Sequence, residues 1–237
     1  MSAMNPESAA ARCPFLKGAV KVEAVDNRPI TQRLKEDNWD LHEQAEHDRV
    51  PQAMVNGEIS REGYVELLKQ MWVINRALDS ALVAARETTP IINDLIPDRQ
   101  LQEPYLRADL EHFGVDVSTI EPTDAALVML DHVKHLSESD PHALFGLHYV
   151  REGANNGNKF VAMKLKKAWG VDLESRDGFR YLDPYGKEQR PLWEAWKARL
   201  ADYPLTEPEK DSVFNGARSM FERIIALHKD LEALVLA

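Results

Sequence analysis

Apolar residues recur at helical spacing along most of the chain. From Ile30 onward they fall three, four and seven positions apart, which is the period of a helix with one buried face. The alternation that marks strands is nearly absent, and no internal repeat is visible. The pattern predicts one all-α domain over residues 29–237, a single bundle of seven or eight helices. Residues 1–28 show no periodicity and are predicted to form a disordered tail.

Capping signals set several helix boundaries. Ser60 and Thr123 each stand directly before a periodic segment and are predicted N-caps. The sequence TEPE at 206–209 predicts a capping box that opens the last helix. Asp140-Pro141, an N-cap followed by proline at the first helical position, opens a helix that is predicted to end at Gly170.

Two segments are harder to interpret. Residues 34–48, LKEDNWDLHEQAEHD, are predicted to form one helix with Leu34, Leu41 and His42 on one side. Residues 171–188 break the periodicity and are predicted to be irregular, with a short hairpin at Asp177-Gly178.

Composition narrows the class of protein. The 237 residues are 44% hydrophobic, so a sizeable core can form. The net charge of −10 argues against a nucleic-acid partner or an anionic membrane surface. The single cysteine, Cys13, cannot build a disulfide framework, which fits the cytoplasm. Since no window approaches 18 uncharged apolar residues, no membrane span is predicted.

The sequence HYVREGANNGNKF, residues 148–160, is poor in helix formers although it lies inside a predicted helix. A glycine there costs about 0.5–1 kcal/mol relative to alanine. Gly153 and Gly157 are four positions apart, so they leave one helix face bare of side chains. Either a flat ligand or another helix could approach that face closely. Asn155, Asn156 and Asn158 favour a kinked, partly hydrated segment.

Three histidines are candidates for an inward-facing role. His42, His148 and His228 lie on the apolar sides of three predicted helices. A lone histidine in such a position is more often a packing residue of the core, but three facing inward from three helices favour a cofactor more than any one alone. A bent helix over a planar ligand, facing a histidine from another helix, is how haem is held between two helices.

Three segments resemble one known family. LKEDNWDLHEQAEHD followed by NGEISREGYVELLKQMWVINRALDSAL resembles the N-terminal third of haem oxygenases, and HYVREGANNGNKF resembles their distal helix. The run WKARLADYPLTEPEKDSVFNGARSMFERIIALHKDL resembles their last helices. The likeness covers roughly residues 30–237, is strongest at 34–82, and points to the bacterial, biliverdin-producing type.

The resemblance implies a role for particular residues. His42 would be the axial ligand of the haem iron, presented by an early helix. Lys35 and Lys197 match basic positions near the haem propionates. Gly153 and Gly157 match distal glycines whose backbone lies against the haem face, and they are predicted to take part in catalysis for that reason.

One further position matches the family pattern, and three positions depart from it. Phe221 matches an aromatic residue that lines the pocket, and His148 stands where mammalian-type enzymes carry a tyrosine near the propionates. Asn158 replaces the second glycine of a usual pair and is a predicted catalytic residue. Ala154 occupies the position at which many members carry an aspartate that organises a distal water network.

The implied activity is that of a haem-degrading monooxygenase. Haem would be both substrate and cofactor, and O₂ would be consumed with electrons from a separate ferredoxin or flavin reductase. The products would be biliverdin, CO and Fe²⁺. The chain itself shows no flavin, nicotinamide or iron–sulfur motif.

Two alternatives remain open. Ala154 and Asn158 favour a haem carrier or sensor without oxygenase turnover, and Cys13-Pro14 resembles the Cys-Pro motif of some haem-regulated proteins. A non-haem, di-iron member of the same superfamily could use the carboxylate–imidazole pairs Asp131–His135 and His148–Glu152, each four positions apart.

Overall fold

The computed structural model describes residue 26 and residues 28–236, so Cys13 lies outside the described residues. Within this part of the chain there are α-helices, three short 3-10 helices and no strand, which confirms the all-α class. The helices are α1 (Ile30–Glu36), α2 (Trp39–His47), α3 (Arg49–Asn56), α4 (Arg61–Ala85), α5 (Pro90–Leu95), α6 (Glu103–His112), α7 (Asp124–Ser139), α8 (Pro141–Ala168), α9 (Gln189–Ala201) and α10 (Glu207–Val235), with the 3-10 helices η1 (Asp98–Gln100), η2 (Val117–Thr119) and η3 (Gly186–Glu188).

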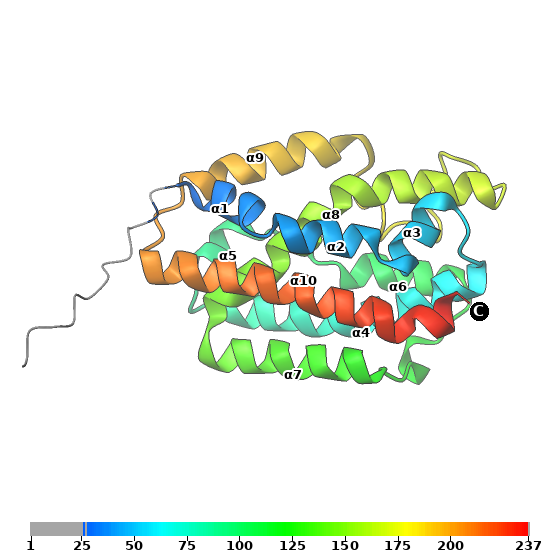
Figure 1. Cartoon of the computed structure of the whole chain (residues 1–237), viewed down its shortest axis with the longest axis horizontal. Helices are drawn as coiled ribbons and strands as arrows, with labels where there is room; N and C mark the ends of the chain where they lie inside the picture. Colours follow the sequence, from blue (N-terminus) through cyan, green and yellow to red (C-terminus); the bar gives the residue numbers. More distant parts are fainter. Residues whose placement is uncertain (1–25, 27, 237) are drawn as a thin grey trace, which may run out of the picture.

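The two longest helices, α8 and α10, cross near their N-terminal ends. A Cβ atom on Gly146 of α8 would lie 2.1 Å from the carbonyl oxygen of Val213, and one on Gly216 of α10 would lie 2.1 Å from that of Ala143. The two backbones therefore touch where neither glycine has a side chain. Helix α4 packs against α6, α7 and α10 on one side of this crossing, and α9 packs against α8 and α1 on the other (Figure 1).

The C-terminal parts of α8 and α10 lie apart from each other. Both remain helical, but the axis of α8 changes direction near its middle and leads away from α10 (Figure 1). Helix α3 contacts both helices in this region. Its C-cap, Gly57, adopts a φ of 73° and lies close to the end of α8, where its Cβ position is 3.0 Å from the Cβ of Ala168.

The predicted helix over 34–48 is wrong, because the structure divides this region. Helix α1 ends before Asn38, whose side-chain amide donates a hydrogen bond to the carbonyl of Leu34 at 3.1 Å. Asp48, with an extended ψ of 154°, separates α2 from α3. Both breaks fall at residues that compete for backbone hydrogen bonds. They and the short α5 raise the number of α-helices above the seven or eight predicted.

Three of the predicted caps are confirmed, whereas Asp140 lies at the N-cap position of α8 without a side-chain capping hydrogen bond. The Ser60 hydroxyl accepts from the Gly63 amide, the Thr123 hydroxyl accepts from Ala126, and Thr206 with Glu209 forms the capping box. Helix α8 begins at Pro141, and Gly170 follows its end with a φ of 65°.

The irregular segment 171–188 contains turns and η3 but no hairpin, so that prediction is wrong. Gly178, with a φ of 80°, turns the chain inward so that its carbonyl accepts a hydrogen bond from the buried Tyr64 hydroxyl. The ring of Phe179 stacks on the ring of Tyr64, with centroids 5.9 Å apart. Side-chain contacts of this kind hold the segment against the bundle. No helix among the described residues is long and apolar enough to cross a membrane.

Candidate functional site

His42 lies on α2, and its ring is in contact with two aromatic side chains. Trp39 stacks on it with ring centroids 5.1 Å apart, and Phe221 of α10 meets it edge-on at 5.8 Å. The Nδ1 atom is shielded from solvent and has no hydrogen-bond partner among the described residues. The Nε2 atom is 3.6 Å from a carboxylate oxygen of Glu46, too far for a good hydrogen bond. The imidazole is thus oriented, while its lone pair is not committed to the protein.

Helix α2 is covered by the protein less than the helices around it. It packs on α10 and α3, yet none of its nine residues is buried. Every other α-helix in the described part of the chain buries at least two residues. Trp39 is 47% exposed, although a large aromatic side chain gains most from burial. The face of α2 that carries His42 therefore has room for a ligand that contributes apolar surface.

The glycines of α8 offer a backbone face that is open. A Cβ on Gly157 would meet no atom within 4 Å, and one on Gly153 would meet only the ring of Trp193, at 3.3 Å. The open space at Gly157 argues against the alternative of another helix packed on this face. Asn156 donates from its amide to the carbonyl of Gly153 at 3.0 Å, so a side-chain bond supports the backbone here. Asn158 is half-buried on the same helix.

The two lysines of the predicted site lie on neighbouring helices. Lys197 of α9 is 5.6 Å from the ring of Trp193, the side chain nearest to Gly153, and it pairs with Glu194 at 3.0 Å. Lys35 is exposed on α1, which packs against α9. Trp193 therefore lies next to both Gly153 and Lys197.

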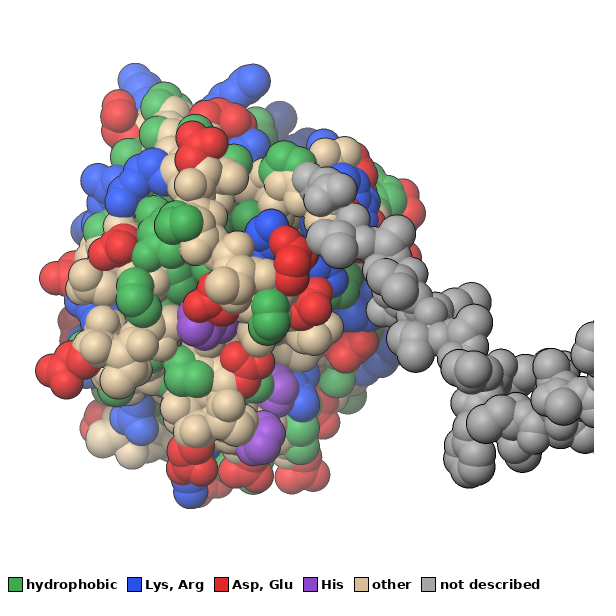
Figure 2. Space-filling view, turned by 90° about the vertical axis from the view of Figure 1, so that its left-hand side faces the viewer, with side chains coloured by type: hydrophobic (Ala, Val, Ile, Leu, Met, Phe, Trp, Pro, Cys, Tyr) green, Lys and Arg blue, Asp and Glu red, His purple; other side chains and the backbone are tan. Residues whose placement is uncertain are grey.

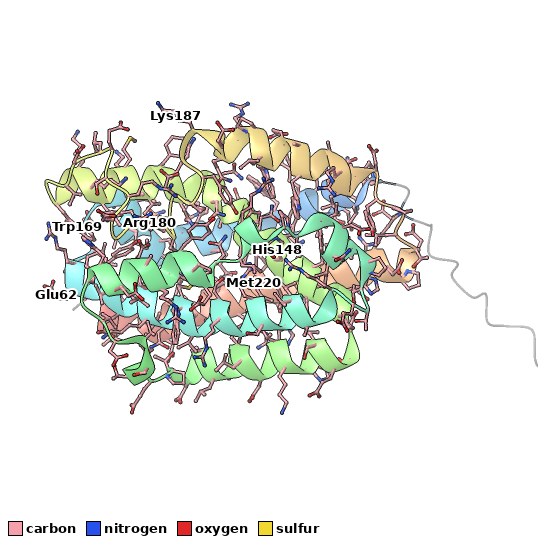
Figure 3. The ribbon with its side chains drawn as sticks, turned by 180° about the vertical axis from the view of Figure 1, so that it is seen from behind. Glu62, His148, Trp169, Arg180, Lys187 and Met220 are labelled. Carbon is pink, nitrogen blue, oxygen red and sulfur yellow. The ribbon has the colours of Figure 1, made fainter. Side chains whose placement is uncertain are left out.

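His148 does not belong to this group of residues. It is fully buried (Figure 3), its Nδ1 accepts from Arg151 Nε at 3.0 Å, and its Nε2 lies 3.1 Å from Gln100 Oε1. Burial, with the neighbouring guanidinium, holds the pKa of His148 well below its usual range, so the ring is neutral and Nε2 is the donor. Both ring nitrogens are occupied, and we do not carry His148 into the proposed site as a haem contact.

Arg151 is the centre of a buried polar network behind α8. Its guanidinium pairs with Asp79 at 2.6 Å and donates to Asn75 at 3.2 Å. Asp79 in turn accepts from the backbone amides of Gln102 and Glu103, both at 2.8 Å, at the start of α6. The network joins α4, α6 and α8, and thereby fixes the helix that carries the glycines.

Glu152, one residue before Gly153, is a second buried charge on the same helix. Its carboxylate accepts from the Tyr185 hydroxyl at 3.1 Å and from the Asn155 amide at 3.2 Å. Burial raises the pKa of Glu152 to about 7, despite these hydrogen bonds. Asn155 is therefore directed into this network, and Ala154 is exposed.

The described residues offer no cluster of metal ligands for the di-iron alternative. No group of three or more His, Cys, Asp or Glu among the described residues could hold a metal ion. The pair His148–Glu152 is committed to Arg151, Gln100 and Tyr185 as described above. His228 is almost buried near Asp48, with Nδ1 3.9 Å from a carboxylate oxygen, and burial lowers its pKa to about 4.

Sequence reasoning missed Trp39 and Trp193. Trp39 is three positions before His42, which places both on one side of a helix, so this contact could have been found from spacing. The contact of Trp193 with Gly153 joins α9 to α8, so no local pattern in the sequence indicates it.

Fold and site together define a class of protein. It is an all-α bundle in which one helix carries an imidazole oriented by aromatic rings and another helix presents a bare backbone face. Comparisons with known proteins identify the family. The heme oxygenase family model matches residues 28–230. Heme oxygenase 2 of Synechocystis is 22% identical over 88% of this chain and 85% of its own length. Heme oxygenase 1 of Pongo abelii is 23% identical over 87% of this chain and 73% of its own.

A solved structure shows the same fold. The crystal structure of heme oxygenase-2 from Synechocystis, in complex with heme and NO, superposes with a TM-score of 0.79 at 23% identity, covering 87% of this chain and 86% of that one. The chain belongs to the haem oxygenase family.

Proposed function

We propose that this protein cleaves haem oxidatively to biliverdin, CO and Fe²⁺, with haem bound between α2 and the glycine face of α8. Membership of the haem oxygenase family supports the class of reaction. The observation that carries the placement is His42, an imidazole oriented by two aromatic rings. Neither nitrogen makes a hydrogen bond with a described residue, and Nε2 is 3.6 Å from a Glu46 carboxylate oxygen. Bound haem would supply the iron that takes up O₂ and the porphyrin edge that is oxidised.

The residues of this chain have separate roles in the proposal. His42 binds the iron, and Phe221 with Trp39 keeps its ring from rotating. Gly153 and Gly157 present bare backbone to the opposite face of the ring, which leaves space for O₂ and water on that side. Their carbonyls and the side chain of Asn158 are the polar groups that would hold water there.

The basic residues select the orientation of the ligand. Lys35 and Lys197, on the adjacent helices α1 and α9, would pair with the two propionates. Lys35 makes no ion pair with a described residue, and the partner of Lys197 is a glutamate three positions away that is itself exposed. Such exposed pairs contribute about 0–1 kcal/mol, so exchange for a propionate costs little.

Electrons for the reaction come from another protein in this proposal, a ferredoxin or a flavin reductase. The sequence contains no motif for a flavin, nicotinamide or iron–sulfur group. We place the reaction in the cytoplasm, where such reduced donors are available.

A haem carrier without turnover is the second candidate, and Ala154 favours it. Its methyl group cannot accept or donate a hydrogen bond, and Asn155 is bonded to Glu152 instead. Reaction of the hemin complex with reduced ferredoxin and O₂ separates the two candidates. Stoichiometric CO and a bilin absorption band support the oxygenase, whereas haem that stays intact supports the carrier.

Hemin titration tests the binding site. We expect a Soret shift on binding to the wild-type chain, and His42→Ala to weaken binding by about tenfold or more, since an iron–imidazole bond is lost. His47→Ala is the matched control, because His47 lies on the same helix but is exposed and bonded to the carbonyl of Glu43. Equal losses in the two variants, or none, would overturn the assignment.

A further inference from the structure

Trp193 of α9 covers one part of the glycine face of α8 and leaves the other part open. A Cβ atom on Gly153 would lie 3.3 Å from Cη2 and 3.6 Å from Cζ2 of the Trp193 indole, whereas one on Gly157 would meet no atom within 4 Å. The two glycines are four positions apart and share one side of the helix. A flat ligand on this side of α8 therefore meets the indole at its edge, beside Gly153.

The neighbours of Trp193 hold its indole in place. It stacks on Trp196 of the same helix, with ring centroids 5.4 Å apart and planes inclined by 24°. Tyr149 of α8 contacts both indoles, with centroids 5.5 and 6.1 Å away. Trp196 is itself buried, and its Nε1 donates to the carbonyl of Leu95 at 2.6 Å. Because closely packed rings do not turn freely, Trp193 forms a rigid boundary of the site.

The two lysines of the proposed site do not fix the angle of a bound haem by themselves. A lysine is a point charge on a flexible stem, so it pairs with a carboxylate without a strong preference for direction. Lys35 is exposed on α1. At the end of the molecule where α1 begins and α9 ends, other basic side chains are interspersed with acidic ones (Figure 2). A propionate could thus find a cation at more than one angle of the ring.

We propose that Trp193 is a positioning residue that fixes the angle of haem about the bond between iron and His42. This inference rests on the proposed function. The rim of haem carries methyl, vinyl and propionate groups, and rotation of the ring would drive one of them into the space that the indole fills. Lys197, whose Nζ is 5.6 Å from the centre of the Trp193 ring, would hold a propionate beside this boundary. Trp193 thereby determines which edge of the porphyrin lies at the open backbone of Gly157, and so which edge is cleaved.

Proton NMR of the cyanide-ligated hemin complex measures this angle without turnover. The shifts of the haem methyl groups depend on the angle between the porphyrin and the plane of its axial imidazole, and the stack on Trp39 sets that plane. Trp193→Phe is the informative variant, because phenylalanine keeps a ring against Trp196 but lacks the Cη2 and Cζ2 atoms that reach Gly153. We expect one dominant set of methyl shifts in the equilibrated wild-type complex. In the variant, a second set should gain about tenfold relative to the first.

Trp169→Phe is the matched control. Trp169 is also an indole in an aromatic cluster, where it contacts Tyr64 and Phe179 just past the end of α8. The same substitution there should leave the methyl shifts as in the wild type. Urea unfolding of both haem-free variants shows whether the two substitutions cost similar stability, so that a change in angle is not mistaken for loss of fold.

The isomers of biliverdin provide the second readout. With ascorbate as reductant and O₂, the wild type should give one main isomer, and Trp193→Phe should give a second isomer in the proportion that the methyl shifts indicate. Chromatography of the pigment separates the isomers.

Two results would overturn the proposal: methyl shifts in Trp193→Phe that equal those of the wild type, or the same change in Trp169→Phe. Hemin that binds through His42 and stays intact would contradict the oxygenase, but the methyl shifts would still test the role of Trp193. A wild-type chain that binds no hemin would contradict the proposed function and this inference together.

Discussion

The indole of Trp39 lies nearly parallel to the imidazole of His42, with ring centroids 5.1 Å apart and planes inclined by 10°. The two residues are three positions apart on α2, so one turn of helix holds both rings. Phe221 of α10 also meets the imidazole, edge-on at 5.8 Å. Contacts within the protein therefore orient the imidazole of His42 before any ligand binds.

This stack predicts faster loss of haem when Trp39 is truncated. An aromatic pair contributes about 0.5–1.5 kcal/mol beyond its buried area, so Trp39→Ala should speed hemin dissociation by about two- to tenfold. Transfer of hemin to apomyoglobin measures the rate. Trp39→Phe keeps a ring in the stack and should restore most of the difference. Equal rates for the alanine and phenylalanine variants would show that the stack has no part in holding haem.

Two glycines of α8 should respond oppositely to alanine. Gly146→Ala places a Cβ 2.1 Å from the Val213 carbonyl oxygen and should destabilise the fold by about 1–3 kcal/mol or more. Gly157→Ala meets no atom within 4 Å, and it should stabilise the helix by up to about 1 kcal/mol. Urea unfolding of the haem-free chain measures both. A stable Gly146→Ala protein would contradict the close crossing of α8 and α10.

A larger side chain at Gly157 should weaken hemin binding without destabilising the haem-free fold. Gly157→Leu has space in the haem-free fold, but its side chain would occupy the face proposed for haem. We expect a folded protein with about tenfold or greater weakening of hemin binding. Ala84→Leu, at an exposed position of α4, is the control for an added surface leucine. Unchanged hemin affinity in Gly157→Leu would remove α8 from the site.

Glu152 should make the protein less stable as pH rises toward neutrality. Its pKa in the folded chain, about 7, lies above its ordinary value of 4.5, so the folded state binds the proton more tightly. The stabilisation is complete below pH 4.5 and is lost as pH rises through 7, by an amount on the order of 3 kcal/mol at most. Asp109, with a pKa raised to about 6 by burial, adds a loss of the same sign at lower pH.

Glu152→Gln isolates this contribution. Glutamine can accept the hydrogen bond from Tyr185 but does not titrate, so the free energy of unfolding should fall less between pH 5 and pH 8 than in the wild type. Urea unfolding at a series of pH values gives the comparison. Parallel curves for the two proteins would show that Glu152 is ionised throughout.

The buried ion pair between Arg151 and Asp79 should be costly to break. Both side chains are at most 8% exposed, and removal of one partner leaves an uncompensated charge. Asp79→Ala should therefore destabilise the fold by about 3–5 kcal/mol. Asp98→Ala, which removes an exposed partner of Arg86, should cost less than about 1 kcal/mol. Similar thermal midpoints for the two variants would contradict this ranking.

The helical class and several helix ends could be predicted from the sequence because they depend on local signals. Ser60, Thr123 and the capping box at Thr206 act within one turn, and each is present in the structure. The division of residues 34–48 has a local cause as well, in Asn38 and Asp48. It was missed because the apolar periodicity continues across both breaks.

The site could be predicted only in part, since its residues meet across long sequence separations. His148 faces inward as its spacing indicates, but its role is decided by Gln100, 48 positions away. Family resemblance assigned it by position and could not reveal that both nitrogens are occupied. The contact of Gly153 with Trp193 likewise depends on the packing of α9 against α8.

The central claim is that His42 and the glycine face of α8 hold opposite faces of one haem. A crystal structure of the hemin complex tests it most directly. The account predicts density for an iron–nitrogen bond from His42 and a porphyrin whose other face rests on the backbone at Gly153 and Gly157. Iron ligated by a different residue, or a porphyrin bound away from α8, would contradict it.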